Sequence, residues 1–131
     1  MRWDEQAERL RRKADQDQQT ATILAAVPSA ADEVIGFHAQ QAVEKMLKAL
    51  LSHRRVAFRR THDLTELIDL LIGDGVSVPP EIDVVRRLGP YAAEFRYEDI
   101  PVGQPERLDR AFVIECVQRT RTWVDQFFGR H

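Results

Sequence analysis

The chain has 131 residues, of which 44% are hydrophobic and 31% are charged, and its formal net charge is −2. These values predict one folded domain over residues 1–131 and exclude both a disordered chain and a globally basic nucleic-acid binder. The single cysteine, Cys116, cannot form an internal disulfide, which indicates a reducing compartment. The sequence lacks a signal-type N-terminal stretch and any apolar run of roughly eighteen residues, so we expect a cytoplasmic protein with no membrane span.

The N-terminal pattern predicts a helix over residues 3–26. Its apolar positions follow a heptad-like seam, and Asp17 occupies the one step where an apolar residue is missing. Pro28 ends this helix, because proline cannot continue it. The seam comprises Trp3, Ala7, Leu10, Ala14, Ala21 and Leu24.

A second helix is predicted from Ser29 or Asp32 to about Arg54. Its apolar residues lie on more than one side of the helix, which predicts a surface left over for a second copy of the chain and hence a homodimer. The residues that widen the apolar face are Val43, Leu47 and Leu51, beside Met46 and Leu50.

A third helix opens at residues 61–64, with Thr61 as the expected N-cap and Asp63 complementing the helix dipole, and residues 73–75 end it. Helical spacing also predicts a fourth helix over 80–95, a loop over 96–103, and a fifth helix from near Pro105 to about Phe128. No segment alternates as a strand does. We therefore predict an all-α protein, an up-and-down antiparallel helical bundle of about five helices.

Motifs for cofactor or metal chemistry are missing from the sequence. It contains no glycine-rich phosphate loop, no CxxC pair and no HExxH motif, and its four histidines are scattered. The acids Glu98 and Asp99 fall in a predicted loop, where acidic side chains are usually solvated. We expect no cofactor, no metal and no assigned catalytic residue.

The second predicted helix carries a line of polar residues, His38, Gln41, Lys45 and Lys48, spaced by three or four. One interpretation is a nucleotide, phosphate or partner site. The lysines would contact phosphate oxygens, and His62, the N–H groups at the start of the third helix, Arg96 and Tyr97 would add to the site. Six Lys or Arg residues and no acid between positions 45 and 62 favour such a ligand.

The alternative interpretation is a structural polar network. An acid on the buried seam of a helix must be paired or hydrogen-bonded, and Asp17 is such an acid. His38 and Gln41 would then satisfy Asp17, and Lys45 would pair with Asp63 or Asp99. The two interpretations are compatible, and we rank the structural network first.

Four segments together resemble the HEPN family (higher eukaryotes and prokaryotes nucleotide-binding domain). FHAQQAVEKMLKALL is similar to the family's second helix, and THDLTELIDLL is similar to its histidine-aspartate-leucine opening of the third. AEFRYED resembles the arginine-tyrosine segment, although Glu98 stands where proline is common. WDEQAERLRRKADQDQQTA resembles the first helix, so the likeness runs from about Trp3 to Trp123.

The resemblance implies a helical bundle that commonly dimerises and binds a small nucleotidyltransferase encoded nearby, often as a toxin–antitoxin pair. It also implies a possible nucleotide or RNA ligand. Many relatives are metal-independent ribonucleases with an arginine, four to six residues, then a histidine. Here the one formal fit, Arg55 to His62, crosses a predicted loop, and no histidine follows Arg96 before the fifth helix. We therefore expect a binding partner first and a ribonuclease toxin second.

Overall fold

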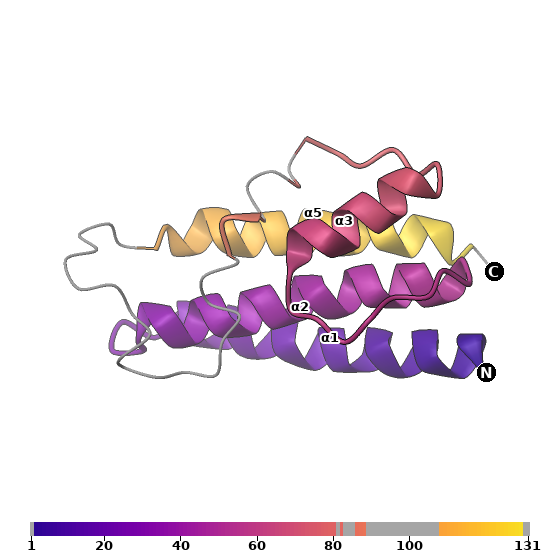
Figure 1. Ribbon diagram of the computed structural model, residues 1–131. Helices are drawn as coiled ribbons and strands as arrows, with labels where there is room; N and C mark the ends of the chain where they lie inside the picture. Colours follow the sequence, from indigo (N-terminus) through magenta and orange to yellow (C-terminus); the bar gives the residue numbers. More distant parts are fainter. Residues whose placement is uncertain (1, 81, 83–85, 89–107, 130–131) are drawn as a thin grey trace.

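The computed structural model describes residues 2–80, 82, 86–88 and 108–129, and its helices are α1 (Trp3–Ala25), α2 (Asp32–His53), α3 (Leu64–Gly73) and α5 (Arg110–Phe127). The described residues contain no strand, so the predicted all-α fold is confirmed (Figure 1). Most of the predicted fourth helix over 80–95, and the whole predicted loop over 96–103, lie outside the described residues.

α1 and α2 form an antiparallel hairpin that runs the length of the molecule (Figure 1). The buried face of α1 is built from alanines seven residues apart, Ala7, Ala14 and Ala21, each at most 2% exposed. Such small side chains allow two helix backbones to approach closely. The seam predicted from the heptad spacing is therefore the face that α1 packs against its neighbours.

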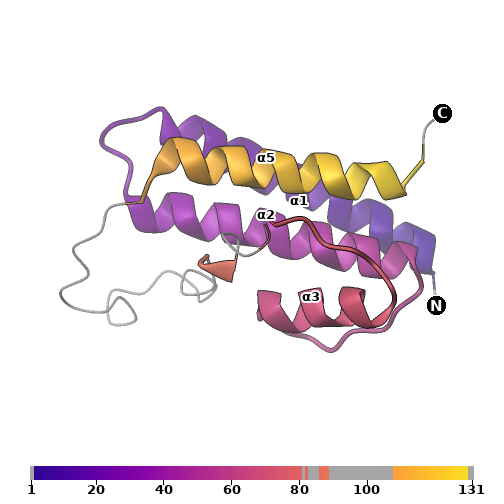
Figure 2. The same cartoon turned by 90° about the horizontal axis from the view of Figure 1, so that it is seen from above.

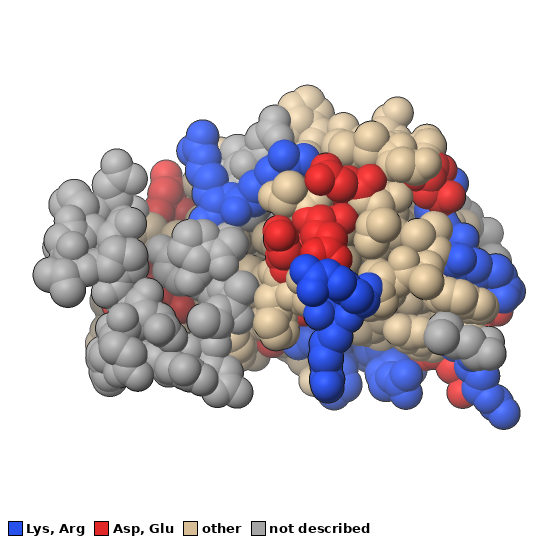
Figure 3. Space-filling model, viewed as in Figure 1, with Lys and Arg blue, Asp and Glu red and all other residues tan. Residues whose placement is uncertain are grey.

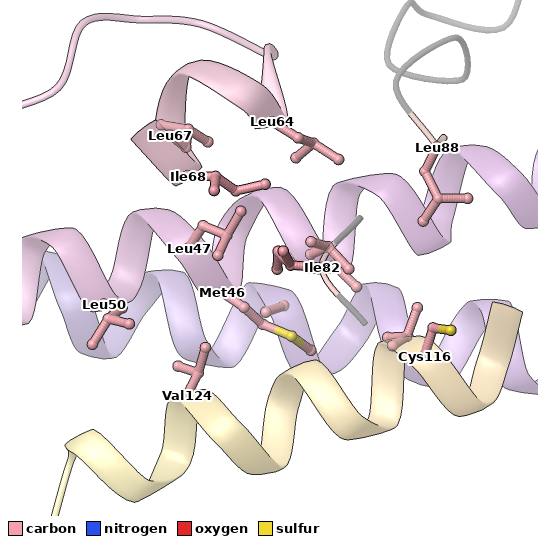
Figure 4. Packing of buried hydrophobic residues seen from close by; sticks show 14 of the residues in the cluster. Met46, Leu47, Leu50, Leu64, Leu67, Ile68, Ile82, Leu88, Cys116 and Val124 are labelled. Carbon is pink, nitrogen blue, oxygen red and sulfur yellow. The ribbon is translucent and has the colours of Figure 1, made fainter. Parts of the chain in front are cut away.

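α2 is the central helix, because it contacts α1, α3 and α5, as the view from above shows (Figure 2). Leu64, Leu67 and Ile68 of α3 cover α2 at Leu47, while Val124 of α5 faces Met46 on another side (Figure 4). The residues that predicted a spare surface for a second copy are thus all buried inside the chain, each at most 3% exposed. The premise of that dimer argument was wrong, because α3 takes up the second apolar side. The residues concerned are Val43, Met46, Leu47, Leu50 and Leu51.

α3 is capped differently from the prediction. The N-cap is Asp63, whose carboxylate accepts hydrogen bonds from the backbone N–H groups of Thr65 and Glu66. The predicted cap, Thr61, instead accepts a hydrogen bond from the Asp63 N–H. The helix ends before Gly75, whose φ of 85° lies in the left-handed region that glycine adopts without strain.

α5 begins later than predicted, at Arg110, because Leu108 and Asp109 are not helical and the Asp109 carboxylate caps Phe112 N–H. The Arg110 guanidinium binds Asp32, at the start of α2, with Nε 2.8 Å from Oδ1. It also donates to backbone carbonyls in the turn between α1 and α2, those of Ala25, Val27 and Ala30. This clamp joins the start of α5 to the turn of the α1–α2 hairpin.

The cysteine and the membrane-span predictions can each be compared with the structure. Cys116 is buried at 4% exposure in the core against α2, in accordance with its interpretation as a small apolar residue. Among the helices in the described part of the chain, none combines the length and the apolar character needed to cross a membrane.

Candidate functional site

The polar line of α2 separates into two hydrogen-bonded clusters, each built around an acid. The Asp17 cluster consists of Asp17, His38 and Lys45. The Glu44 cluster consists of Gln40, Gln41, Glu44, Lys48 and His62. Each cluster combines one carboxylate with one imidazole and one lysine.

The Asp17 cluster connects α1 to α2. Asp17 Oδ1 lies 3.0 Å from His38 Nδ1, and its other oxygen binds the Lys45 ammonium. His38 and Lys45 are seven residues apart on α2, so both reach the same carboxylate from one face of the helix. The Asp17 side chain is 14% exposed and thus depends on these partners for its charge.

The Glu44 cluster lies deeper and connects α2 to the segment before α3. The Glu44 side chain is only 3% exposed. Its Oε2 accepts from Lys48 Nζ at 2.9 Å, and its Oε1 lies 2.9 Å from His62 Nδ1. Gln40 Nε2 donates to Glu44 Oε1 at 3.0 Å and to the His62 carbonyl at 3.2 Å. Gln41 Nε2 donates to Gln40 Oε1 at 2.7 Å and, at 3.4 Å, to Glu44 Oε1.

The contacts of the polar line agree with the structural network in outline but differ from it in the partners. Lys45 pairs with Asp17, whereas Asp63 caps α3, and Gln41 belongs to the Glu44 cluster rather than binding Asp17. Glu44 itself was missed by the sequence analysis. Its spacing to Lys48 resembles an ordinary exposed i,i+4 pair, and its burial is not evident from the sequence of α2 alone.

The cations expected to receive a phosphate are largely matched by acids. Lys45 and Lys48 contact Asp17 and Glu44, and Arg59 donates two hydrogen bonds to Glu66, at 2.8 and 2.7 Å. Through these hydrogen bonds and its charge, Glu66 raises the pKa of Arg59. On the face shown in Figure 3, a group of acidic side chains likewise lies directly against a group of basic ones.

The N–H groups at the start of α3 are also occupied. The prediction that they point at an external anion is not supported by the contacts, because the Asp63 carboxylate already accepts from two of them. A carboxylate in that position also repels a second anion. The start of α3 therefore presents a satisfied cap.

Arg55 and His62, the two residues of the formal nuclease spacing, lie in different places. His62 contacts Glu44, in the middle of α2, whereas Arg55 follows the end of α2 and lies 3.9 Å from Asp4 of α1. Nine residue steps lead from Glu44 to His53 at the end of α2, a rise of about 14 Å along the helix axis at about 1.5 Å per residue. The contacts of His62 and of Arg55 therefore lie at different positions along α2.

Three predicted residues, Arg96, Tyr97 and Asp99, lie outside the described residues. Within the described residues, no group of three or more His, Cys, Asp or Glu side chains is arranged to hold a metal ion. A hollow of about 140 Å³ lies between α1 and α5, away from the polar line, with an apolar floor and a charged rim. Its rim ion pairs, Arg11 with Asp125 and Arg121 with Asp15, cross between the two helices.

Comparisons with known proteins agree with this architecture. A family model described as "HEPN domain" matches residues 7–127. The crystal structure of ST0689, an archaeal HEPN homologue, superposes with a TM-score of 0.69 at 23% sequence identity, covering 94% of this chain and 98% of that one. At this identity the likeness concerns the fold. No curated protein matches the sequence significantly.

Proposed function

The chain belongs to the HEPN domain family, and from this premise we propose that it is the binding partner of a small nucleotidyltransferase, in a cytoplasmic toxin–antitoxin-like pair. The contact surface is the region where the polar line of α2 meets the segment before α3. Binding to the partner, rather than chemistry, is the activity assigned to this surface.

The observation that carries the proposal is the pairing of both lysines of the polar line with acids inside the chain. A phosphate would have to compete with Asp17 and Glu44 for these cations. Protein–protein interfaces, in contrast, are depleted of charged residues at their core and have a polar rim, so they do not require unpaired cations. The nucleotide or RNA interpretation of the site is therefore the less supported form of the same proposal.

The ribonuclease alternative has weaker support. The resemblance implies that ribonucleases of this family use an arginine together with a histidine that transfers a proton near the scissile phosphate. In this chain Arg55 lies beside Asp4 of α1, whereas His62 contacts Glu44 in the middle of α2. Expressing the chain alone while measuring growth and RNA integrity tests this alternative. RNA cleavage that is abolished by His62→Ala would overturn the assignment of binding as the main activity.

Co-purification tests the partnership directly. A tagged chain is expressed with the nucleotidyltransferase encoded beside it, and the complex is measured by size-exclusion chromatography. We expect Arg60→Glu, a change at an exposed residue two positions before His62, to weaken the complex. Arg12→Glu makes the same charge change at an exposed position of α1 and serves as the control. If the wild-type chain forms no complex, or if both variants behave alike, the proposal is wrong.

We propose further that the chain forms a homodimer, as the family commonly does. Because the apolar sides of α2 are covered within the chain, we expect the dimer interface to use a surface other than these apolar residues. Light scattering at micromolar concentration measures the mass, and a monomeric mass would contradict this part of the proposal. Titration of ATP into the isolated chain tests the nucleotide form of the site, for which we expect no saturable binding.

A further inference from the structure

The buried carboxylate of Glu44 determines which nitrogen of His62 carries a proton. The side chains that bind Glu44 are Gln40, Gln41, Lys48 and His62, and each approaches it with a nitrogen. An ionised carboxylate can only accept hydrogen bonds. The Nδ1 atom of His62, 2.9 Å from Oε1, must therefore carry hydrogen, and Nε2 holds the lone pair whenever the imidazole is neutral.

The second ring nitrogen, Nε2, belongs to a largely exposed side chain and has no described hydrogen-bond partner. The exposed fraction of the His62 side chain is 62%. The chain provides two internal comparisons. His38 also contacts a carboxylate, but its side chain is only 27% exposed. His53 stacks on the Phe128 ring at 4.3 Å, and no described carboxylate binds it. Of these three, His62 alone combines a fixed tautomer with a largely exposed ring.

We propose that Glu44 is a positioning residue that makes His62 Nε2 the exposed acceptor of this surface, and that the group it receives is an O–H or N–H donor rather than a phosphate. A hydroxyl or amine of the bound partner donates its hydrogen to Nε2. If the proton transfers, the electron pair stays on the partner's oxygen or nitrogen, and the imidazolium is stabilised by Glu44. The inference rests on the proposed function in one respect: it assumes that the partner binds at the surface that contains His62.

Nitrogen-15 NMR of the histidine-labelled full chain tests the tautomer without a partner. In alkaline solution, where imidazoles are neutral, we expect His62 to show the Nδ1–H form. We expect His53 to show the Nε2–H form that free imidazole favours. A His62 spectrum with hydrogen on Nε2 would overturn the inference.

Reaction with diethyl pyrocarbonate tests the availability of Nε2. This nitrogen attacks a carbonyl carbon of the reagent, the anhydride C–O bond breaks, ethyl carbonate leaves as carbon dioxide and ethanol, and the Nδ1 proton is released to solvent. Peptide mass spectrometry gives a rate for each histidine. We expect His62 to react faster than His53. Glu44→Gln should slow His62 about tenfold, by analogy with the lower end of the roughly 10- to 100-fold loss seen when the carboxylate behind a metal-bound histidine is changed.

The controls separate positioning from simple exposure. Glu115→Gln removes an exposed carboxylate on α5 and should leave the His62 rate unchanged. If Glu44→Gln folds, as judged by circular dichroism, and His62 reacts at the wild-type rate, exposure alone explains the reactivity and the inference fails. If the variant does not fold, the wild-type NMR spectrum decides the question.

Inorganic phosphate tests the ligand class. Titration in alkaline solution should leave the His62 nitrogen shifts unchanged, and a saturable shift would show that the surface receives anions instead. None of these measurements contains the nucleotidyltransferase. If they fail, the proposed partnership is unaffected. If the co-purification fails, the inference that Glu44 positions His62 is unaffected.

Discussion

The Asp17 cluster and the Glu44 cluster contain the same three kinds of charged or titratable side chain but differ in where the acid comes from. In the first, the acid belongs to α1 and both partners belong to α2, so the cluster connects two long helices. In the second, the acid and its lysine are one turn apart on α2, and only His62 comes from elsewhere. The first cluster fixes the hairpin, and the second fixes the position of one exposed imidazole.

Burial also differs between the clusters. The Asp17 side chain is 14% exposed, whereas the Glu44 side chain is 3% exposed. A charge in the first cluster can recover part of its hydration if a partner is lost, but one in the second cannot. The comparison therefore predicts that disrupting the Glu44 cluster lowers the free energy of unfolding more than disrupting the Asp17 cluster does.

Glu44→Gln should give the largest loss of stability. It leaves the Lys48 ammonium, whose side chain is 12% exposed, without its carboxylate. We expect the free energy of unfolding to fall by about 3 kcal/mol, the lower end of the range for breaking a buried ion pair. Urea denaturation followed by circular dichroism measures the loss. Glu115→Gln, at an exposed pair with Arg119, should cost about 0.5 kcal/mol or less.

Asp17→Asn should have a smaller effect. The amide still accepts one hydrogen bond, and His38 and Lys45 keep access to water at 27% and 23% exposure. We expect a loss of about 1.5–2 kcal/mol, the lower part of the range for hydrogen bonds to a charged group. The same urea experiment measures it. A loss larger than that of Glu44→Gln would reverse the ranking and show that the link between the helices dominates.

The smallest expected effect is the coupling energy between the two clusters. The stability loss of the double variant should be close to the sum of the two single losses. Among the described residues, no hydrogen bond joins the two clusters. Independent sites add within about 0.5 kcal/mol. A double-mutant cycle of Asp17→Asn with Glu44→Gln measures the coupling. A value above about 1 kcal/mol would show that the polar line acts as one network.

The two clusters also show which buried acids can be predicted from the sequence alone. Asp17 could be singled out because it interrupts an apolar seam, a local pattern that requires a partner for the acid. Glu44 could not, since its burial depends on where the chain before α3 crosses α2, eighteen residues later. The same limit applies to Leu47, whose apolar side was interpreted as free although α3 covers it.

Some helix ends follow from nearby residues, whereas others depend on residues far away in the sequence. The ends of α1 and α3 follow from Pro28 and from the glycines after Leu71, because these residues act on their own backbone. The start of α5 has one local determinant, the Asp109 carboxylate that caps Phe112 N–H. It has a second, distant one in Asp32, which binds both Leu108 N–H and the Arg110 guanidinium. The sequence around residue 110 does not contain this second contribution.

The Arg110 clamp has a consequence for the order of events on the ribosome. Its guanidinium binds carbonyl oxygens of Val27 and Ala30, which converge only when the turn between α1 and α2 has closed. The residues of that turn are synthesised about 80 residues before Arg110. We therefore expect the hairpin to form first and α5 to dock on it late, after a loop-closure cost that grows slowly with the intervening length.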